Sequence, residues 1–471
     1  MSNYRTPGVY VEEITSLPPS VAAVATAIPI FVGYTARQPA DNVPTPINSY
    51  LEFRQIFGTG QDLTATEVRL AADNTVQDVT FNVTHYLQLA LRLFYANGGG
   101  FCYVKSIGTP PGDGALAAVS DGDITTALFD ELATYDDPTI VIFPDHPGSD
   151  SYDDILQHCA TAKDRFAILD VASDDYNGSQ LRNDVGTEGL SYGAAYTPWL
   201  RCVLPKGLAA HQFSATTFNL ADGTSETGLT SGLISDVDSS VVDAATSSTA
   251  GEARDEAQAN LSNNSTVFRN IMRGINAAEL LLPPSGAVAG VYASVDAARG
   301  VWKAPANVSL RGVSAPDERF TRTELENLNV HTTGKSINAI RHFSGKGTLI
   351  FGARTLAGND GEYRYVSVRR LMNMIEESCA KACEGFLFEP NTTNTWVRVR
   401  AMIENFLELI WRDGGLQGAT AAEAFDVAIG LGETMTAQDV TDGRMIVSVS
   451  VAPVRPAEFI VLRFVQHLPT S

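Results

Sequence analysis

The chain has 471 residues, of which 54 are acidic and 33 basic, so its formal net charge is −21. Hydrophobic residues make up 44% of the chain, enough for a sizeable core, and at roughly 100–200 residues per domain the length predicts several domains. The acidity argues against a nucleic-acid partner, because affinity for phosphates comes largely from clustered Lys and Arg.

Neither a secretory signal nor a membrane-spanning helix is predicted. Glu12 and Glu13 stand where a signal peptide would need its apolar core. The longest apolar stretch, at 21–32, is shorter than the ~20 residues that a spanning helix requires. The five cysteines are too few and too scattered for a disulfide framework, and Cys379 and Cys383 are expected to be buried thiols on one face of a helix.

The first 20 residues are predicted to form an extended arm. Residues 9–11 are strong strand formers, and the proline pair at 18–19 separates them from the rest of the chain. The elements expected next are a buried strand, a helix and a second strand, at residues 27–35, 84–95 and 101–104.

The middle of the chain contains one α/β signature. Two apolar runs, at 139–144 and 165–172, flank a helical pattern at 152–163, and this spacing predicts a right-handed crossover between parallel strands. Residues 205–265 are rich in Ser, Thr, Gly, Ala and Asp without a sustained period, so we expect an insertion that is partly loop.

The last third predicts two amphipathic helices and a final strand. The two helical stripes consist of Leu371, Ile375, Ser378 and Ala382, and of Val399, Ile403, Phe406 and Ile410. Residues 460–465 alternate apolar side chains with a face that contains Arg463, as in a strand at or near a sheet edge. Strand formers therefore occur near both ends of this sequence.

One segment matches the nucleophile elbow of α/β-hydrolases, with Ser191 between Gly189 and Gly193. The elbow needs a buried strand that leads into the serine, but residues 182–188 are polar. Four histidines could be proposed as its base, none in a distinctive context: His211, His331, His342 and His467. A Gly-flanked turn or helix start is favoured, and a serine hydrolase using Ser191 is kept as the alternative hypothesis.

Two Gly-Lys pairs resemble the end of a phosphate loop. Residues 334–336 read Gly-Lys-Ser, but Asn329 stands where the first glycine belongs, and residues 345–348 have glycine where a hydroxyl residue should follow the lysine. The adjacent acids at 136–137, 153–154 and 174–175 favour a solvated acidic face over a calcium site. We therefore predict no catalytic residue, no metal site and no cofactor.

Several blocks of the sequence resemble the contractile tail sheath family of phages, phage-like particles and extracellular injection systems. The resemblance covers residues 1–105 and 280–471 well and the middle only loosely. The matching blocks lie at 7–13, 103–106, 284–307, 337–356, 368–378, 388–391 and 452–459. Residues 191–199, which contain the elbow-like serine, look like a structural Tyr-and-Pro-Trp segment of this family.

The resemblance implies a mixed α/β fold, with a conserved inner sheath domain, terminal exchange strands and an inserted α/β outer domain. The expected parts are an N-terminal strand arm (1–20), the N-terminal part of the conserved region (21–104), a variable acidic outer α/β domain (105–285, with its insertion near 205–265), and a conserved C-terminal sheath domain that ends in an exchange strand (286–471).

The resemblance also implies a helical homopolymer, because family members form stacked rings of six subunits around an inner tube and contract to drive that tube through a target envelope. Neighbours are linked when an N-terminal and a C-terminal strand from different subunits complete a small sheet in a third. The residues expected to exchange are Val9, Tyr10, Val11, Glu12, Ile460, Val461, Leu462, Arg463, Phe464 and Val465.

The expected partners are the chain itself, the inner tube protein, baseplate and terminal cap proteins, and paralogous sheath subunits, without nucleic acid or direct membrane insertion. Arg364, Arg369 and Arg370 are candidates for tube contact, and a solvated helix start is the alternative for them. We expect assembly in the bacterial cytoplasm, as part of a phage tail, a released extracellular particle or a cell-anchored system. A non-contractile shell protein is a further alternative.

The net charge is concentrated in the middle of the chain. Residues 105–285 contain 26 acidic and 9 basic side chains, a net charge of −17, whereas the remainder has 28 acidic and 24 basic, a net charge of −4. Only 18% of all residues are charged, against a usual ~25%. An assembly subunit with an acidic outer part and much of its remaining surface in interfaces would explain both numbers.

Overall fold

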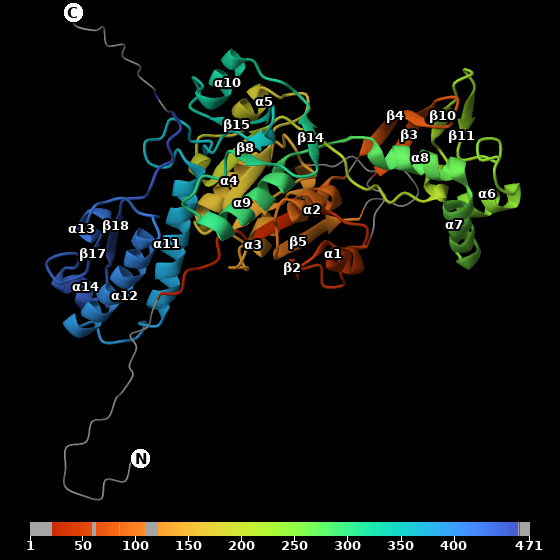
Figure 1. The fold of residues 1–471 in the computed structure, drawn as a ribbon. Coiled ribbons are helices and arrows are strands. Elements are labelled where there is room, and N and C mark those ends of the chain that lie inside the picture. Colours follow the sequence, from red (N-terminus) through yellow and green to blue (C-terminus); the bar gives the residue numbers. More distant parts are fainter. Residues whose placement is uncertain (1–20, 59–62, 84, 110–120, 460, 462–471) are drawn as a thin grey trace, which may run out of the picture. The chain divides into compact units, whose positions relative to one another are not determined.

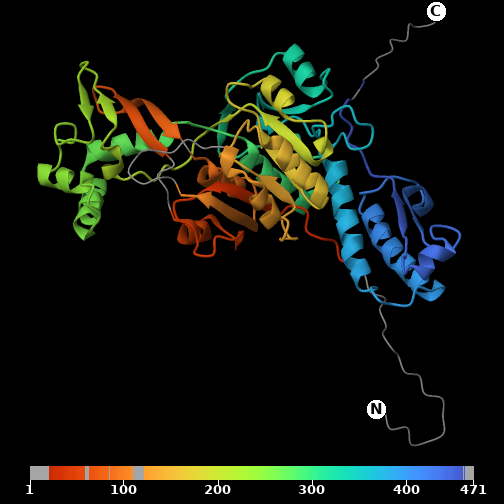
Figure 2. The same cartoon turned by 180° about the vertical axis from the view of Figure 1, so that it is seen from behind.

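The computed structural model describes residues 21–58, 63–83, 85–109, 121–459 and 461 (Figure 1; seen from behind in Figure 2). The chain divides into two compact units. The larger unit contains Ala25–Asn373 and Arg455–Ser471, and the smaller unit contains Met1–Val24 and Met374–Val454. The chain therefore passes from one unit to the other three times.

The larger unit is built around a nine-stranded sheet with the strand order β13-β16-β15-β8-β7-β6-β1-β5-β2. The six strands from β15 to β5 are parallel to one another. Each strand outside them, β16, β13 and β2, pairs antiparallel with its inner neighbour. The strands are β1 (Pro29–Tyr34), β2 (Thr45–Ile47), β5 (Cys102–Gly108), β6 (Ile140–Ile142), β7 (Phe166–Asp170), β8 (Gly193–Thr197), β13 (Val308–Ser309), β15 (Ile337–Phe343) and β16 (Gly347–Ile350).

Helices cover both faces of this sheet, because successive side chains of a buried strand point to opposite sides. On β1, Phe31 packs in one core with α2 and α9, whereas Ile30 and Val32 pack in the other core with α3 and α4. The helices of this part are α1 (Tyr50–Phe57), α2 (Leu87–Ala96), α3 (Thr126–Leu132), α4 (Tyr152–Ala162), α5 (Ser179–Asp184), α9 (Ser285–Arg299) and α10 (Arg322–Asn329). The predicted α/β fold and the crossover at 139–172 are confirmed.

Short elements complete this part of the larger unit. A three-stranded antiparallel sheet consists of β12 (Leu280–Leu282), β9 (Leu200–Cys202) and β14 (Val313–Pro316). Three 3₁₀ turns lie at η1 (Asp121–Asp123), η2 (Leu190–Tyr192) and η3 (Ala210–Phe213).

The segment expected to be a partly looped insertion has a hydrophobic core, which it shares with an earlier stretch of the chain. Its sheet has the order β11-β10-β3-β4, and β10 pairs in parallel with β3. Phe213, Phe218, Leu261, Phe268 and Ile271 are buried together in its core. Its elements are β3 (Leu63–Leu70), β4 (Val76–Val83), β10 (Thr217–Asn219), β11 (Ser225–Thr227), α6 (Ser239–Thr246), α7 (Glu252–Asn264) and α8 (Thr266–Ala277). The local sequence pattern is weak because half of the sheet comes from residues 63–83.

The smaller unit combines helices with a two-stranded sheet. Both predicted helical stripes are confirmed, and Val399, Ile403, Phe406 and Ile410 are all buried. The elements are α11 (Val366–Glu384), which begins in the larger unit, α12 (Thr393–Arg412), α13 (Ala421–Ala424), β17 (Phe425–Ala428), α14 (Ala437–Thr441) and β18 (Ser448–Val451).

The two units do not divide at residue 286, where the predicted C-terminal sheath domain begins, and that domain boundary stays a prediction. Residues 286–373 belong to the larger unit, because α9 packs on its sheet while β15 and β16 are strands of it. The assignment of inner and outer parts of an assembly is a separate matter and stays a prediction. Within the described residues, no helix is both long enough and apolar enough to cross a membrane.

Candidate functional site

The crevice where an open α/β sheet usually binds a ligand is filled by the protein itself. The strand order reverses at β1, whose neighbours are β5 on one side and β6 on the other, and ligands bind outside the carboxyl ends of strands at such a switch point. Asp145, just after β6, is 3% exposed, and its Oδ2 accepts a hydrogen bond from Tyr34 N (2.7 Å). Its Oδ1 accepts from Leu87 N (3.0 Å) and from Tyr86 N at the start of α2.

Asp145 therefore occupies the place that a ligand's phosphate would take at the N-terminus of α2. Gly33 leaves room for it, because a Cβ at that position would lie 2.2 Å from Asp145 Oδ2. Burial raises the pKa of Asp145 to about 6, against the opposing effect of the backbone hydrogen bond from Tyr34. A phosphate could enter only by displacing this carboxylate.

A second buried carboxylate closes the N-terminus of α9 in the same way. Asp170 ends β7, is 1% exposed, and its Oδ1 accepts a hydrogen bond from Ser285 N (2.7 Å). Burial raises the pKa of Asp170 to about 7. Sequence reasoning missed both aspartates, although Asp145 directly follows the apolar run at 139–144 and Asp170 lies within the run at 165–172.

The nucleophile-elbow pattern does not have the geometry of an elbow. Ser191 lies in η2, and β8 follows it, whereas an elbow serine follows a strand and starts a helix. The lysine of the phosphate-loop pattern is also structural: Lys335 is buried, and its Nζ donates to the carbonyls of Arg182 (2.7 Å) and Val185. Among the described residues, no group of three or more His, Cys, Asp and Glu could hold a metal ion.

Among the described residues, the smaller unit contains a two-stranded sheet. β17 and β18 pair antiparallel from Phe425 opposite Val451 to Ala428 opposite Ser448. In the part of the chain that the structure describes, no third strand pairs with either outer edge of this sheet. An isolated pair of strands is only marginally stable and offers its free main-chain groups to further strands.

The predicted exchange strands themselves lie outside the described residues, apart from Val461. Residues 9–12, 460 and 462–465 thus stay predictions as exchange strands. The points where the two arms join the fold are described. On the N-terminal side, Val24 N in the smaller unit donates to Ser378 Oγ (3.0 Å).

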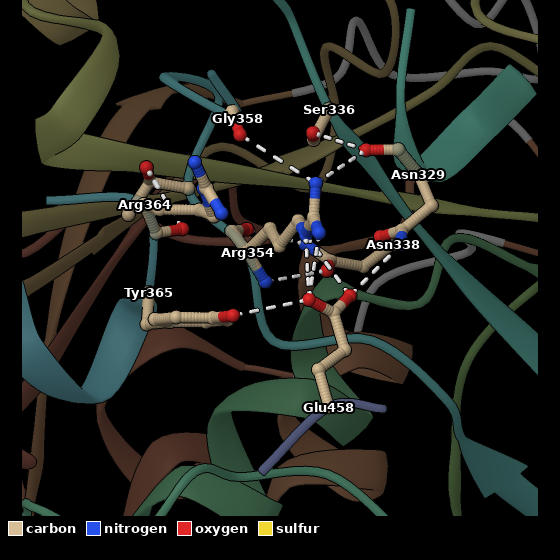
Figure 3. Close-up of polar contacts among 9 residues, drawn as sticks. Asn329, Ser336, Asn338, Arg354, Gly358, Arg364, Tyr365 and Glu458 are labelled. Carbon is tan, nitrogen blue, oxygen red and sulfur yellow. Dashed lines mark hydrogen bonds and ion pairs between the residues drawn. The ribbon is translucent and has the colours of Figure 1, made fainter. Parts of the chain in front are cut away.

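On the C-terminal side, Arg354 holds Glu458 (Figure 3). Arg354 Nη2 lies 2.6 Å from Glu458 Oε2, and Nε lies 2.9 Å from Oε1. Asn329 Nδ2 donates to Glu458 Oε1 (2.8 Å), and Tyr365 Oη donates to Oε2 (3.1 Å). We call these four residues, Asn329, Arg354, Tyr365 and Glu458, the tail clasp.

A strand of the large sheet holds the tail clasp in position. Asn338 on β15 holds the main chain of Arg354 from both sides, since its Oδ1 accepts from Arg354 N (2.8 Å) and its Nδ2 donates to Arg354 O (2.7 Å). The side chain of Arg354 is 4% exposed and that of Glu458 23%. Burial alone would raise the pKa of Glu458, but the hydrogen bonds from Arg354 and Asn329 lower it below its usual value.

The three arginines predicted to face a tube have different positions. Arg370 is 4% exposed, lies 2.6 Å from Asp296, and donates through Nη2 to Thr26 O (2.7 Å). Arg369 is 3% exposed and lies over the rings of Tyr192 and Tyr363. These two side chains are buried inside the subunit, so a direct contact between them and a tube is not supported. Arg364 is half-buried, and its role stays a prediction.

Two family models match consecutive parts of the chain. The model of the phage tail sheath protein central domain matches residues 151–356, and the model of the phage tail sheath C-terminal domain matches residues 359–467. The chain belongs to the phage tail sheath family.

Solved sheath structures agree over nearly the whole chain. The sheath complex of the extracellular contractile injection system PVC in the contracted state is 30% identical, with a TM-score of 0.64 and coverage of 99% of both chains. The helical sheath of the anti-feeding prophage in the contracted state is 29% identical, with a TM-score of 0.63 and coverage of 99% of this chain and all of that one. As a member of this family, the chain is a structural sheath protein.

A curated tail sheath protein, from Vibrio phage KVP40, is 27% identical over 188 residues. That match covers 39% of this chain and 26% of the phage protein. The tail clasp lies in blocks that carry the family resemblance, since Arg354 belongs to 337–356 and Glu458 to 452–459. Sequence reasoning missed their pairing because the two residues are 104 positions apart in the chain.

Proposed function

We propose that this chain polymerises as a helical stack of rings around an inner tube and contracts to drive that tube through a target envelope. The family assignment supports a structural sheath subunit, and the two-stranded sheet β17–β18 carries the proposal further. Its free edges suit the addition of arm strands from two neighbouring subunits, with main-chain hydrogen bonds for strength and alternating side chains for register.

The proposed partners are further copies of the chain, a tube protein, and baseplate and cap proteins. One similar structure is that of the anti-feeding prophage baseplate, 30% identical with a TM-score of 0.63, which supports association with a baseplate. We place assembly in the bacterial cytoplasm and the finished particle outside the cell or in a phage tail. Contacts that do not close on themselves generate helical filaments, as this function requires.

Removal of the N-terminal arm tests the proposal. Deletion of residues 1–15 is expected to leave a folded subunit that forms no tubular sheath, because it takes away one of the two linking strands. Negative-stain electron microscopy of the purified protein is the measurement, with circular dichroism as the check of folding. Tubes of normal length and width from the truncated protein would refute strand exchange through this arm.

A full-length pair of variants controls for the loss of mass. The double substitution Val9→Pro and Val11→Pro removes two main-chain donors and should abolish tubes as the deletion does. The double substitution Val9→Thr and Val11→Thr keeps strand-forming residues at both positions, so this variant should still form tubes. Short, wide tubes beside long, narrow ones in the wild-type images would distinguish a contractile sheath from a static shell.

A further inference from the structure

The chain connects the C-terminal arm to both units within a few residues. In the smaller unit, Val454 N donates to Gly415 O (3.1 Å), and Pro453 bridges to Leu416. In the larger unit, the tail clasp holds Glu458. Only residues 455–457 lie between these two attachments, and they include Pro456, so this connector has little slack.

The described residues that follow the tail clasp are exposed. Phe459 is 71% exposed and Val461 is 78% exposed, whereas the Glu458 side chain is 23% exposed. Residues 456–459 also line a cavity of about 500 Å³ in the larger unit, together with Leu325, Ile337 and Phe351. Among the described residues, Glu458 is therefore the last one whose side chain is held by several polar contacts.

We propose that the tail clasp is a mechanical anchor, which passes a pull on the C-terminal arm into the larger unit and keeps it off the smaller unit. The inference rests on the proposed exchange of this arm, because a neighbour that binds the arm can pull on it. Without the clasp, the same pull would pass through the connector and the contacts of Pro453 and Val454 into β18, which pairs with one strand, β17, among the described residues.

The geometry suits such an anchor. Arg354 engages both carboxylate oxygens of Glu458, and a paired guanidinium and carboxylate with two parallel hydrogen bonds is a strong, directional contact. Behind it, Asn338 ties the main chain of Arg354 to β15, a strand inside the nine-stranded sheet. A strand paired on one side only, such as β18, can instead be peeled away one hydrogen bond at a time. The clasp thus protects the sheet that we propose as the acceptor of neighbouring strands.

Single-molecule stretching of the full-length monomer tests the anchor. One handle is attached at the C-terminus and the other at an insertion after Gly223, in the exposed hairpin turn between β10 and β11 of the larger unit. Unfolding of residues 374–454 under load lengthens the chain by up to about 290 Å, since each extended residue spans at most about 3.3–3.6 Å.

The expected result is a shorter lifetime of the smaller unit in Glu458→Gln. At constant force, the waiting time before this lengthening should fall about tenfold or more, because the load then passes through residues 453–454 into β18. Tyr365→Phe, which removes one hydrogen bond from the clasp, should shorten it less. Equal lifetimes in wild type and Glu458→Gln would overturn the proposal.

Two controls separate anchoring from general stability. Glu326→Gln breaks an exposed ion pair with Arg322 (3.0 Å) in the same unit and should leave the lifetime unchanged. With both handles moved into the smaller unit, at insertions after the exposed turn residues Gly385 and Gly443, Glu458→Gln and wild type should behave alike, because this pull does not pass through the clasp. A shortening in that second geometry would show a general loss of stability and refute the anchor.

The stretching experiment does not depend on assembly. If the deletion of residues 1–15 still gave normal tubes while Glu458→Gln shortened the lifetime, strand exchange through the N-terminal arm would be wrong and the anchor would stand. If that deletion abolished tubes and the lifetimes were equal, the anchor would be wrong and exchange through the N-terminal arm would stand. Thermal unfolding by circular dichroism establishes for each variant that the subunit is folded before it is stretched.

Discussion

Two buried aspartates lie at the carboxyl ends of neighbouring parallel strands in the larger unit. Asp145 and Asp170 are both nearly inaccessible to solvent, and each accepts hydrogen bonds from the first amides of a helix. Such amides carry partial positive charge, which favours an anion, but burial of the carboxylates opposes it. Burial prevails, so that the pKa of Asp145 is about 6 and that of Asp170 about 7.

The stability of the folded subunit is expected to depend on pH through Asp170. Its pKa is about 7 in the folded state against a usual value of 3.8, so the folded state binds the proton more tightly. The contribution of this proton binding to the free energy of unfolding is therefore complete below the unfolded pKa and is lost as the pH rises through about 7. The substitution Asp170→Asn removes the titrating group, while its amide oxygen can still accept the hydrogen bond from Ser285 N.

Urea unfolding of wild type and Asp170→Asn at about pH 4.5, 6 and 7.5 measures this effect. The free energy of unfolding of the variant should lie furthest below that of wild type at the lowest pH, and this deficit should shrink as the pH rises. The exposed substitution Glu326→Gln controls for the removal of one negative charge. A difference between Asp170→Asn and wild type that did not vary with pH would contradict a titrating, buried Asp170.

At the scale of single elements, the close approach of α2 and α9 depends on two glycines one helical turn apart. A Cβ at Gly286 would lie 2.3 Å from Ala90 O, and one at Gly290 would lie 2.5 Å from Phe94 O. The two helices share a core with β1 and β6, so they cannot separate without exposing it. The glycines thus let the backbone of α9 touch that of α2.

Gly290→Ala is expected to destabilise the subunit by about 1–3 kcal/mol, because an extra methyl group would have to push backbone atoms apart. The free energy of unfolding from urea titration is the measurement. Gly361→Ala is the matched control, since no atom lies near the Cβ that it adds, and its effect should stay within about 0.5 kcal/mol. Two variants of equal stability would show that α9 can shift at no cost.

At the scale of the whole molecule, the acidic surplus belongs to the middle of the sequence. Part of it lies on α7, where Glu252, Asp255 and Glu256 are all exposed. A surface of one charge sign repels its copies on other particles and keeps them apart in solution. The proposed outer position of this region would place that repulsion where particles meet.

Reversal of these charges is expected to make assembled particles cluster at low salt. The triple substitution Glu252→Lys, Asp255→Lys and Glu256→Lys gives α7 a positive surface that attracts the remaining acidic face of a neighbouring particle. Dynamic light scattering should show the clusters dissolve as added salt shortens the screening length to about 8–10 Å at 0.1–0.15 M. The triple change to Gln controls for lost repulsion alone, and particles that stayed dispersed with lysines would contradict the idea.

Local patterns predicted much of the fold. The buried strand β1, the crossover from β6 through α4 to β7, and the stripes of α11 and α12 were all found, because each is encoded by neighbouring residues. The β3–β10 pair and the Arg354–Glu458 contact were not, because their partners are far apart in sequence. The burial of Arg369 and Arg370 was not predicted for a related reason: their charges pointed to a surface, while the distant partners Tyr192 and Asp296 hold them in the interior.

The split origin of the four-stranded sheet has a consequence for protein synthesis. The β3–β4 hairpin leaves the ribosome well before β10 and α8, which complete its core at residue 277. At about 5–20 residues per second, the hairpin waits on the order of ten seconds or more with one face uncovered. During that time Ala65, Val68 and Leu70 lack the core residues at 208–275 that later cover them. The nascent chain therefore passes through a stage in which the hairpin is open to chaperones and to premature pairing with other nascent copies.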